Sequence, residues 1–348
     1  QDYKEIIMQW LRWLLFPFTI LYTLIIWVRN KLYDLKVFPS QTFPVMTIVV
    51  GNLAVGGAGK SPLTQKLIQY FSNKYRVATL SRGYGRKTKG FRLVEVEDRV
   101  ENVGDEPLQF KKNFPNITIA VNENRTEGIE ILQKDHDLII LDDAFQHRKV
   151  TPKCSILLFE YNSILNPIFL LPTGNYRDTF NQTKRADIVL ITKCPDEIPT
   201  MEKNKIESKI KSYNKTTTIY YSKIGYKELI PKSENATGII GLPKNILLVT
   251  GIANPQPLAE YLRINAVKKE HLKFPDHHNF DEFDYKVINA RFEKLNADGD
   301  CILLTTEKDA QRLLLNRLEG IPIYYIPIDI IIEDEDQFFQ ELETSILR

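Results

Sequence analysis

The stretch Ala54–Ser61, Ala-Val-Gly-Gly-Ala-Gly-Lys-Ser, has the residue types and spacing of a loop that binds phosphate. It fits the pattern GxxxxGK[ST], with alanine in place of the first glycine. Glycines allow consecutive backbone N–H groups to turn inward around phosphate oxygens, and Lys60 would reach the β- and γ-phosphates. A helix expected over 61–73, with Pro62 in its first turn, would add its positive end. The predicted nucleotide site consists of Ala54, Val55, Gly56, Gly57, Ala58, Gly59, Lys60 and Ser61.

A magnesium ion at such a loop needs carboxylate ligands besides the Ser61 hydroxyl. Asp142 and Asp143 end an apolar run that predicts a strand, LIILDD. The carboxyl edge of a parallel strand is where the cation of a phosphate-loop enzyme lies. Adjacent side chains on an extended chain point in opposite directions, so we expect only one aspartate to touch the ion directly. Ser61, Asp142 and Asp143 are the predicted metal-binding residues.

The elements that must position these residues alternate along the chain. Apolar runs that predict strands occupy 45–50, 76–80, 117–121, 137–142, 155–160, 187–192, 245–250, 301–306 and 321–327. Helices are expected at 61–73 and 125–134, among others. Continuous apolar strands separated by helices indicate an α/β fold with a parallel sheet covered on both faces, as in phosphate-loop NTPases. We expect a phosphate-loop domain over 36–225, a smaller α/β domain over 226–348, and a connection within 197–235.

Composition limits the classes of function. The chain has 348 residues, 43% of them apolar, which is enough for the cores of two domains. Its 46 basic and 44 acidic residues leave a net charge of +2, whereas nucleic-acid-binding proteins usually show a basic excess on one face. Cys154, Cys194 and Cys301 are scattered and form no zinc-binding pattern. We therefore expect no nucleic-acid partner, no structural zinc, and reduced thiols in a cytosol-facing protein.

Residues 1–35 are expected to anchor the protein to a membrane. The segment 6–28 is apolar apart from Gln9, Arg12 and a few hydroxyls, and all three tryptophans lie near its ends. Tryptophan favours the membrane–water boundary. The uncharged run 13–28 would be about 24 Å long as a helix, whereas a bilayer core is roughly 30 Å thick, so spanning and lying in the interface both stay open. No small-residue cleavage site follows, which argues against a signal peptide.

Several further segments, taken together with the loop, resemble the tetraacyldisaccharide 4′-kinases, which phosphorylate a lipid A precursor. They occur in the family's order across nearly the whole chain. The matching segments are GNLAVGGAGKSP (51–62), LSRGYGR (80–86), VGDEP (103–107), DDAFQHR (142–148), LLPTGNYRD (170–178), RADIVLITK (185–193), TGIANPQPL (250–258), FPDHHNF (274–280) and TTEKDAQRL (305–313). The resemblance implies ATP and Mg²⁺, and transfer of the γ-phosphate to the 4′-hydroxyl of a tetraacyldisaccharide 1-phosphate, forming lipid IVA.

The resemblance also implies roles for individual residues. Asp105 matches the family's proposed base, paired with His277 of the C-terminal domain; an imidazole beside a carboxylate can orient it and share its proton. With Lys60 they form the predicted catalytic set. The predicted substrate-binding residues are Arg82, Glu106, His147, Arg148 and Arg177. Lys308 and Asp309 are expected to have a structural role or to lie at the nucleotide's edge.

One segment departs from the family. Where the family usually has GPLRE, this chain has Asn175, Tyr176 and Asp178 around Arg177, which leaves the substrate contacts of this segment open. The glycine-rich loop also resembles that of ATPases that partition cargo or load metals. Those carry an extra lysine early in the loop, where Val55 stands here. A membrane-associated ATPase regulated by a partner protein is therefore the alternative function.

The resemblance suggests where the protein acts. A lipid with several acyl chains stays in the bilayer, so the enzyme must reach it there, and membrane attachment raises the local substrate concentration. ATP requires the catalytic face to be cytosolic. We expect the inner membrane as location, the acylated disaccharide and the bilayer as partners, and no obligate protein partner.

Overall fold

The computed structural model describes residues 12–238, 241–252, 254–265, 268–276 and 278–348. The chain forms two compact units, one made of Gln1–Ile224 and Ile330–Arg348 and the other of Gly225–Asp329. The expected boundary near residue 225 agrees with this division, but the expected C-terminal domain 226–348 is too long. Ile330–Arg348 returns to the first unit because its apolar side chains, such as Phe338, are buried in that unit's core.

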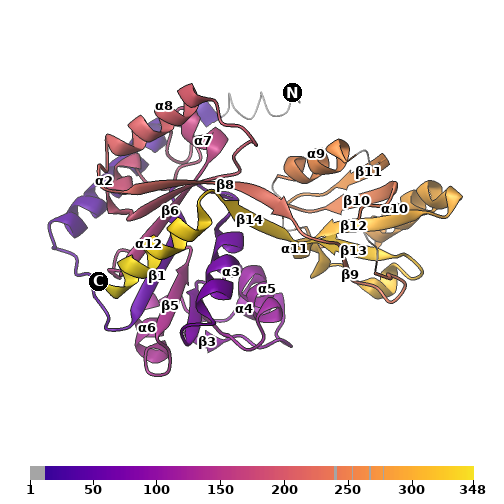
Figure 1. The fold of residues 1–348 in the computed structure, drawn as a ribbon, viewed down its shortest axis with the longest axis horizontal. Helices are drawn as coiled ribbons and strands as arrows, with labels where there is room; N and C mark the ends of the chain where they lie inside the picture. The colour runs from indigo at the N-terminus through magenta and orange to yellow at the C-terminus, as the bar shows by residue number, and fades with distance from the viewer. Residues whose placement is uncertain (1–11, 239–240, 253, 266–267, 277) are drawn as a thin grey trace. The chain divides into compact units, whose positions relative to one another are not determined.

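The first unit is built on a nine-stranded sheet in the order β14-β8-β7-β6-β1-β5-β2-β4-β3 (Figure 1). Its strands are β1 (Met46–Asn52), β2 (Val77–Ser81), β3 (Arg92–Leu93), β4 (Thr118–Val121), β5 (Leu138–Asp142), β6 (Cys154–Glu160), β7 (Ile188–Thr192), β8 (Thr218–Tyr226) and β14 (Ile328–Ile332). The central strands pair in parallel, and β3 is antiparallel to β4. The predicted parallel α/β sheet is confirmed. Its six predicted strands are β1, β2, β4, β5, β6 and β7.

Both faces of this sheet are covered, because its strands alternate their side chains between two buried clusters. On β1, Val49 belongs to one cluster, and Ile48 and Val50 to the other. The covering helices are α2 (Phe16–Asp34), α3 (Lys60–Phe71), α4 (Val100–Val103), α5 (Asp105–Asn113), α6 (Arg125–Leu132), α7 (Tyr161–Leu165), α8 (Thr200–Lys211) and α12 (Glu335–Leu347). The predicted connection 197–235 is wrong up to Ile224, because this part of it forms α8 and most of β8 within the first unit.

The second unit contains a five-stranded sheet in the order β11-β10-β12-β13-β9. Its elements are β9 (Ile230–Pro231), β10 (Asn245–Thr250), α9 (Gln256–Ile264), β11 (Lys268–Lys273), α10 (Glu282–Leu295), β12 (Cys301–Thr306), α11 (Glu307–Ala310) and β13 (Ile323–Ile326). β10, β11, β12 and β13 pair in parallel, and β9 is antiparallel to β13. Buried apolar clusters pack on both faces of this sheet as well.

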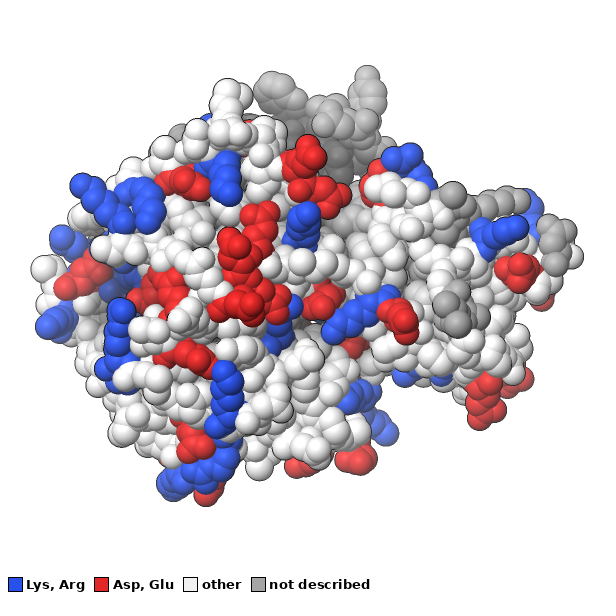
Figure 2. Space-filling view, in the orientation of Figure 1, with Lys and Arg blue, Asp and Glu red and all other residues white. Residues whose placement is uncertain are grey.

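The N-terminal helix α2 begins within the segment predicted to be apolar and continues to Asp34. Among the helices that the structure describes, none is long and apolar enough to cross a membrane. Residues 1–11, where the predicted segment starts, lie outside the described part of the chain. On the face drawn in Figure 2, lysine and arginine side chains lie among acidic ones, and acidic side chains form the largest group of one sign.

Candidate active site

The predicted phosphate loop connects β1 to α3 at the carboxyl edge of the sheet. Gly56 and Gly59 have φ angles of 109° and 86°, which side chains rarely allow, so the glycines are required by the turn. The Thr192 hydroxyl at the end of β7 donates to the Ala58 carbonyl at 2.9 Å and fixes the loop to the sheet. Helix α3 begins directly after Gly59, and no described side chain caps its first N–H groups. Such N–H groups are suited to bind an anion.

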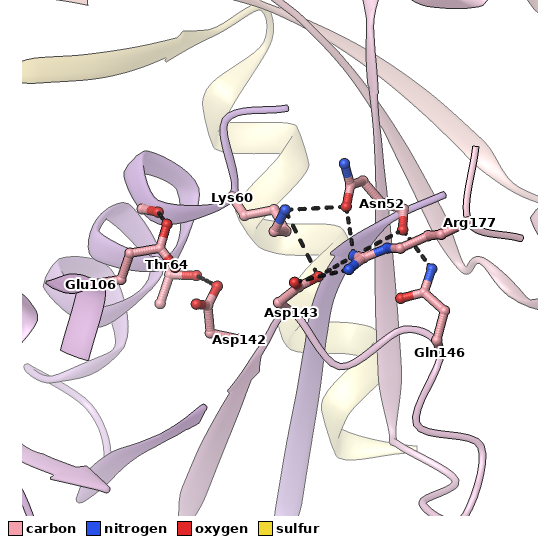
Figure 3. A network of polar contacts seen from close by, with 9 residues as sticks. Asn52, Lys60, Thr64, Glu106, Asp142, Asp143, Gln146 and Arg177 are labelled. Carbon is pink, nitrogen blue, oxygen red and sulfur yellow. Dashed lines mark hydrogen bonds and ion pairs between the residues drawn. The ribbon is translucent and has the colours of Figure 1, made fainter. Parts of the chain in front are cut away.

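Lys60 lies in a network of polar side chains at this edge (Figure 3). Its ammonium donates to Asn52 Oδ1 at 3.1 Å and lies 3.8 Å from Asp143 Oδ1. Arg177 contacts the same two residues, donating to Asn52 Oδ1 at 2.8 Å and to both carboxylate oxygens of Asp143. Gln146 donates to the Asn52 carbonyl at 2.6 Å. Asn52, the last residue of β1, therefore links the phosphate loop to two other segments. One follows β5 and contains Gln146, and the other contains Arg177.

Asp143 is held in an unusual backbone conformation, with φ at 47°. Burial would raise the pKa of its carboxyl, but the charge of Lys60 and the hydrogen bond and charge of Arg177 more than offset this and lower the pKa. Asp143 is therefore ionised at neutral pH, and two cations neutralise it.

Asp142 points the other way, toward α3 (Figure 3). Its Oδ1 accepts a hydrogen bond from the Thr64 hydroxyl at 3.0 Å, and its side chain is almost completely buried. Burial, followed by the nearby carboxylates Glu106 and Asp143, raises the pKa of Asp142 to about 7, against the opposing charge of Lys60. The two aspartates have different partners, as the sequence predicts for adjacent residues at a strand end.

Glu106 lies beside the predicted metal-binding residues. Its Oε1 accepts a hydrogen bond from the Ser61 hydroxyl at 2.7 Å, and its charge raises the pKa of Asp142. The side chains of Ser61, Glu106, Thr64 and Asp142 thus bring carboxylate and hydroxyl oxygens together, which are the ligands that Mg²⁺ prefers. The structure places Glu106 at this oxygen cluster, whereas the sequence assigned it to the substrate.

No three His, Cys, Asp or Glu side chains in the described ranges converge as a ready metal-binding group. A Mg²⁺ site of a phosphotransferase does not need one, because this ion is usually held by one or two carboxylates together with substrate phosphates and water. The buried carboxylate of Asp142, with its raised pKa, is a position where an added cation would be favourable. The residues present therefore fit a Mg²⁺ ion that enters with a nucleotide.

Asp105 is the first residue of α5 and directly precedes Glu106. Because Glu106 contacts Ser61, the N-terminus of α5 lies beside the start of α3, and the half-buried Asp105 is brought to the same edge of the sheet as the phosphate loop. Gly104 before it has a φ angle of 95°, which allows the chain to turn sharply from α4 into α5. This places the predicted base on a helix that the loop itself contacts.

The segment that departs from the family pairs with the phosphate loop. Val55 N–H donates to the Asn175 carbonyl at 2.7 Å, and Arg177 N–H donates to the Leu53 carbonyl at 2.8 Å. A bridge between Ala54 and Tyr176 lies between these two bonds. Backbone groups make these contacts, so they tolerate changes of side chain. The Arg177 side chain, which the segment shares with the family, is the one that enters the polar network.

Basic side chains surround His147. Burial, followed by the charges of Arg125, Lys149, Arg29 and Arg82, lowers the pKa of His147 to about 4. The imidazole is therefore neutral at pH 7, and its Nε2 is buried without a hydrogen-bond partner among the described residues. A phosphate group would find several positive charges and a ring nitrogen available for a hydrogen bond here.

Arg148 contacts the N-terminal helix α2. Its guanidinium donates to the Asn30 carbonyl at 2.9 Å and to Asp34 Oδ1 at 2.7 Å, near the end of α2. A cation there is favoured by the helix dipole. In this structure Arg148 holds α2, and its contact with the substrate stays a prediction.

The second unit contains the remaining predicted residues. His277 lies outside the described residues, so its pairing with Asp105 stays a prediction. The neighbouring His278 Nε2 lies 2.6 Å from Asp284 Oδ2. Asp309 is fully buried, and its Oδ2 accepts from Gly251 N–H at 2.9 Å and from the Thr306 hydroxyl at 2.7 Å. These contacts give Asp309 the structural role that was one of the two expected.

Three residues of the site were missed by the sequence analysis. Asn52 ends β1 and is shared by Lys60 and Arg177, and Thr64 donates to Asp142. Helical spacing could have found Thr64, since residues 61 and 64 lie on one face of α3. Arg125 is almost completely buried, and burial lowers its pKa to about 10. The sequence gives no signal for Asn52 and Arg125, because Arg177, which contacts Asn52, and His147, whose pKa Arg125 lowers, lie in other segments of the chain.

Comparison with known proteins gives consistent results. The family model described as Tetraacyldisaccharide-1-P 4'-kinase (LpxK) matches residues 11–347. A tetraacyldisaccharide 4'-kinase of Flavobacterium psychrophilum is 40% identical, over 96% of this chain and 97% of that protein. One of Flavobacterium johnsoniae is 41% identical over 98% of each. A crystal structure of LpxK from Aquifex aeolicus in complex with ATP has a TM-score of 0.74 and 27% identity, covering 97% of this chain and 99% of that one.

Proposed function

The chain belongs to the tetraacyldisaccharide-1-P 4′-kinase family, and from this premise we propose how its residues carry out the reaction. The enzyme transfers the γ-phosphate of ATP to the 4′-hydroxyl of a tetraacyldisaccharide 1-phosphate in lipid A biosynthesis. The observation that carries the proposal is the hydrogen bond from Ser61 to Glu106, because it brings the phosphate loop and the helix of Asp105 together. The alternative, an ATPase regulated by a partner protein, would need neither Asp105 nor a lipid-binding surface.

The phosphate loop would hold the triphosphate. The uncapped N-terminus of α3 and the turn made by Gly56 and Gly59 offer backbone N–H groups to the phosphate oxygens. Lys60, which Asn52 holds at 3.1 Å, would bind the β- and γ-phosphates. Arg177 neutralises Asp143, so this carboxylate does not repel the phosphates that Lys60 binds.

Ser61, Asp142 and Glu106 would hold Mg²⁺. When bound, this ion supplies positive charge to the phosphate oxygens during transfer. The Ser61 hydroxyl donates to Glu106 in this structure, and with a cation it would present its oxygen lone pair instead. Thr64 would keep Asp142 oriented through its 3.0 Å hydrogen bond. Asp143, which already contacts Lys60 and Arg177, would orient these cations and not touch the ion.

Asp105 would act as the general base. As the bond between the 4′-oxygen and the γ-phosphorus forms, the bond from that phosphorus to the β–γ bridging oxygen breaks, and the hydroxyl proton passes to the Asp105 carboxylate. Base catalysis of this kind contributes about 10²–10⁴-fold to the rate. The sequence resemblance adds His277 as the group that would orient this carboxylate.

The basic side chains around His147 would bind the phosphate that the lipid already carries. Arg82 is exposed and directly follows β2. Arg125 is buried, and its positive charge is close enough to His147 to lower the pKa of the imidazole. A dianionic phosphate would be attracted by both guanidinium groups and could accept a hydrogen bond from a ring nitrogen of His147. This assignment keeps Arg82 and His147 as substrate-binding residues and adds Arg125.

Helix α2 would attach the enzyme to the cytoplasmic face of the inner membrane. Its large apolar side chains are more than half exposed at Phe18, Ile20, Leu21, Leu24, Ile25 and Trp27, as are those of Trp13 and Leu14 just before it. An apolar surface of this size on a helix, with Arg12 and Arg29 near its ends, suits an interfacial helix that lies in the headgroup region. The lipid substrate and cytosolic ATP would then meet at the same surface.

The experiment is a transfer assay with purified enzyme, labelled ATP, Mg²⁺ and an acylated disaccharide 1-phosphate in mixed micelles. We expect a labelled bisphosphorylated lipid, and Asp105→Asn should lose about 10²–10⁴-fold of this activity while ATP binding is kept. Glu101→Gln is the matched control, since Glu101 is an exposed carboxylate just before α5 that pairs with Lys87 at 2.9 Å. ATP hydrolysis without lipid product would favour the alternative, and normal transfer by Asp105→Asn would remove the base assignment.

A further inference from the structure

Helix α2 places its polar side chains toward the protein and its apolar side chains outward. The buried or half-buried positions recur every three or four residues and include Thr19, Tyr22, Thr23, Arg29 and Asn30. This is the reverse of an ordinary surface helix, whose apolar stripe faces the core. Polar residues that are buried are expected to have specific partners, and these partners show what the helix holds.

Two of the partners flank Arg177. The Tyr22 hydroxyl donates to the Arg177 carbonyl at 2.9 Å, and Asn30 Nδ2 donates to Asp178 Oδ1 at 2.7 Å. Asp178 is almost completely buried, and the same oxygen accepts from Thr179 N–H at 2.8 Å. Helix α2 therefore holds the chain at Arg177 and at the next residue, Asp178.

A third contact holds the other side of the same network. Arg29 Nη2 donates to the Gln146 carbonyl at 2.8 Å, and Gln146 donates to the Asn52 carbonyl at 2.6 Å. Asn52 Oδ1 accepts from both Arg177 and Lys60. Helix α2 thus contacts both segments whose side chains surround Asn52 and Lys60, although none of its described residues has a polar contact with Lys60.

We propose that Tyr22 and Asn30 are positioning residues, through which α2 holds Arg177 in place for phosphoryl transfer. The inference rests on the proposed function. It assigns α2 a second role besides attachment: the polar inner face of the helix orders the segment that carries Arg177, independently of the apolar outer face. Turnover at saturating substrate, and not only the encounter with lipid, then depends on the inner face of α2.

The test compares the two faces of the helix. Tyr22→Phe removes one hydroxyl and keeps the ring, and Asn30→Ala removes the amide. Each should lower kcat about three- to tenfold, as expected for loss of one hydrogen bond that orients a reacting group, with KM for the lipid and binding to vesicles unchanged. Leu24→Ala, on the exposed face, is the matched control and should weaken binding to phospholipid vesicles and raise KM while leaving kcat at saturating lipid unchanged.

A double-mutant cycle shows whether the effect passes through Arg177. If it does, Tyr22→Phe has no further effect on kcat in an Arg177→Lys background, although it lowers kcat in the wild type. The proposal is overturned if the two effects multiply, if Tyr22→Phe has wild-type kcat, or if Leu24→Ala lowers kcat equally. A wild-type enzyme that transfers no phosphate to the lipid would overturn the proposed function itself, which distinguishes that failure from failure of this inference.

Discussion

Removing the buried carboxylate of Asp142 is expected to stabilise the protein without ligand and to abolish its response to Mg²⁺ and ATP. Burial and the neighbouring carboxylates raise the pKa of Asp142 from 3.8 to about 7. A carboxyl whose pKa is raised on folding stabilises the folded state fully only below pH 3.8, and this stability is lost as the pH rises through 7. Asp142→Asn keeps the shape and an oxygen acceptor for Thr64, and it removes the ionisation.

The size of the effect follows from the two pKa values. Between pH 5 and pH 8, ionisation of Asp142 lowers the free energy of unfolding of the wild type by about 2–3 kcal/mol. Asp142→Asn should therefore gain that much more stability, relative to the wild type, at pH 8 than at pH 5. With Mg²⁺ and ATP present, the wild type should become more stable than Asp142→Asn, because binding of these ligands stabilises the wild type and not the variant.

Urea unfolding with pulse-labelling hydrogen exchange on peptides of β5 and α3 would follow the first unit by itself. Asp137→Asn is the matched control, directly before the first residue of the same strand, where Arg76 lowers the pKa of an exposed carboxylate to about 2. Asp137→Asn should change the free energy of unfolding by the same amount at pH 5 and pH 8, because both pH values lie above the pKa of this carboxyl. Equal effects of Asp142→Asn at the two pH values, or undiminished stabilisation of this variant by Mg²⁺ and ATP, would refute the reasoning.

Three further predictions concern the surrounding residues. Lys60→Ala should lower transfer to the lipid about 10²–10³-fold in the labelled-phosphate assay, while binding to vesicles is kept, and activity within tenfold of the wild type would contradict its role. Arg177→Lys should lose about tenfold in kcat in the same assay, because an ammonium cannot reach Asn52 Oδ1 and both carboxylate oxygens of Asp143 at once. An unchanged kcat would count against this role. The imidazole of His147 should titrate near pH 4 by NMR and shift to higher pH when a sugar phosphate is added, whereas a group that already titrates near 6.5 would argue against the basic surroundings.

The sequence predicted the core of the fold well because the signals were local. Apolar runs of strand length marked six strands of the first sheet, each buried on both faces, and three of the second. It failed on α8, whose lysine-rich, polar composition resembles that of a linker, and on β8, which follows it in the same stretch. It also failed on Ile330–Arg348, because nothing local tells which of two sheets an amphipathic terminal helix will cover.

The same distinction holds for the site. Glycine spacing, one lysine and two aspartates at a strand end were enough to predict the glycine-rich loop and the carboxylates that lie beside it. The contacts of Arg148 were not predicted, since an arginine next to a functional segment gives no indication that its partners are Asn30 and Asp34, more than a hundred residues earlier in the chain.

The sequence by itself determined the chemistry available at the loop, since the phosphate-binding turn is made by neighbouring residues whose conformational freedom and charge are intrinsic. Only the tertiary structure decided how that chemistry is arranged. It directed Asp142 to Thr64 and Asp143 to Arg177, placed Glu106 on Ser61, and turned the polar face of the N-terminal helix toward the site. Contacts between residues far apart in the chain depend on which strands become neighbours and on what each buried polar group must find as a partner, and no local pattern contains that information.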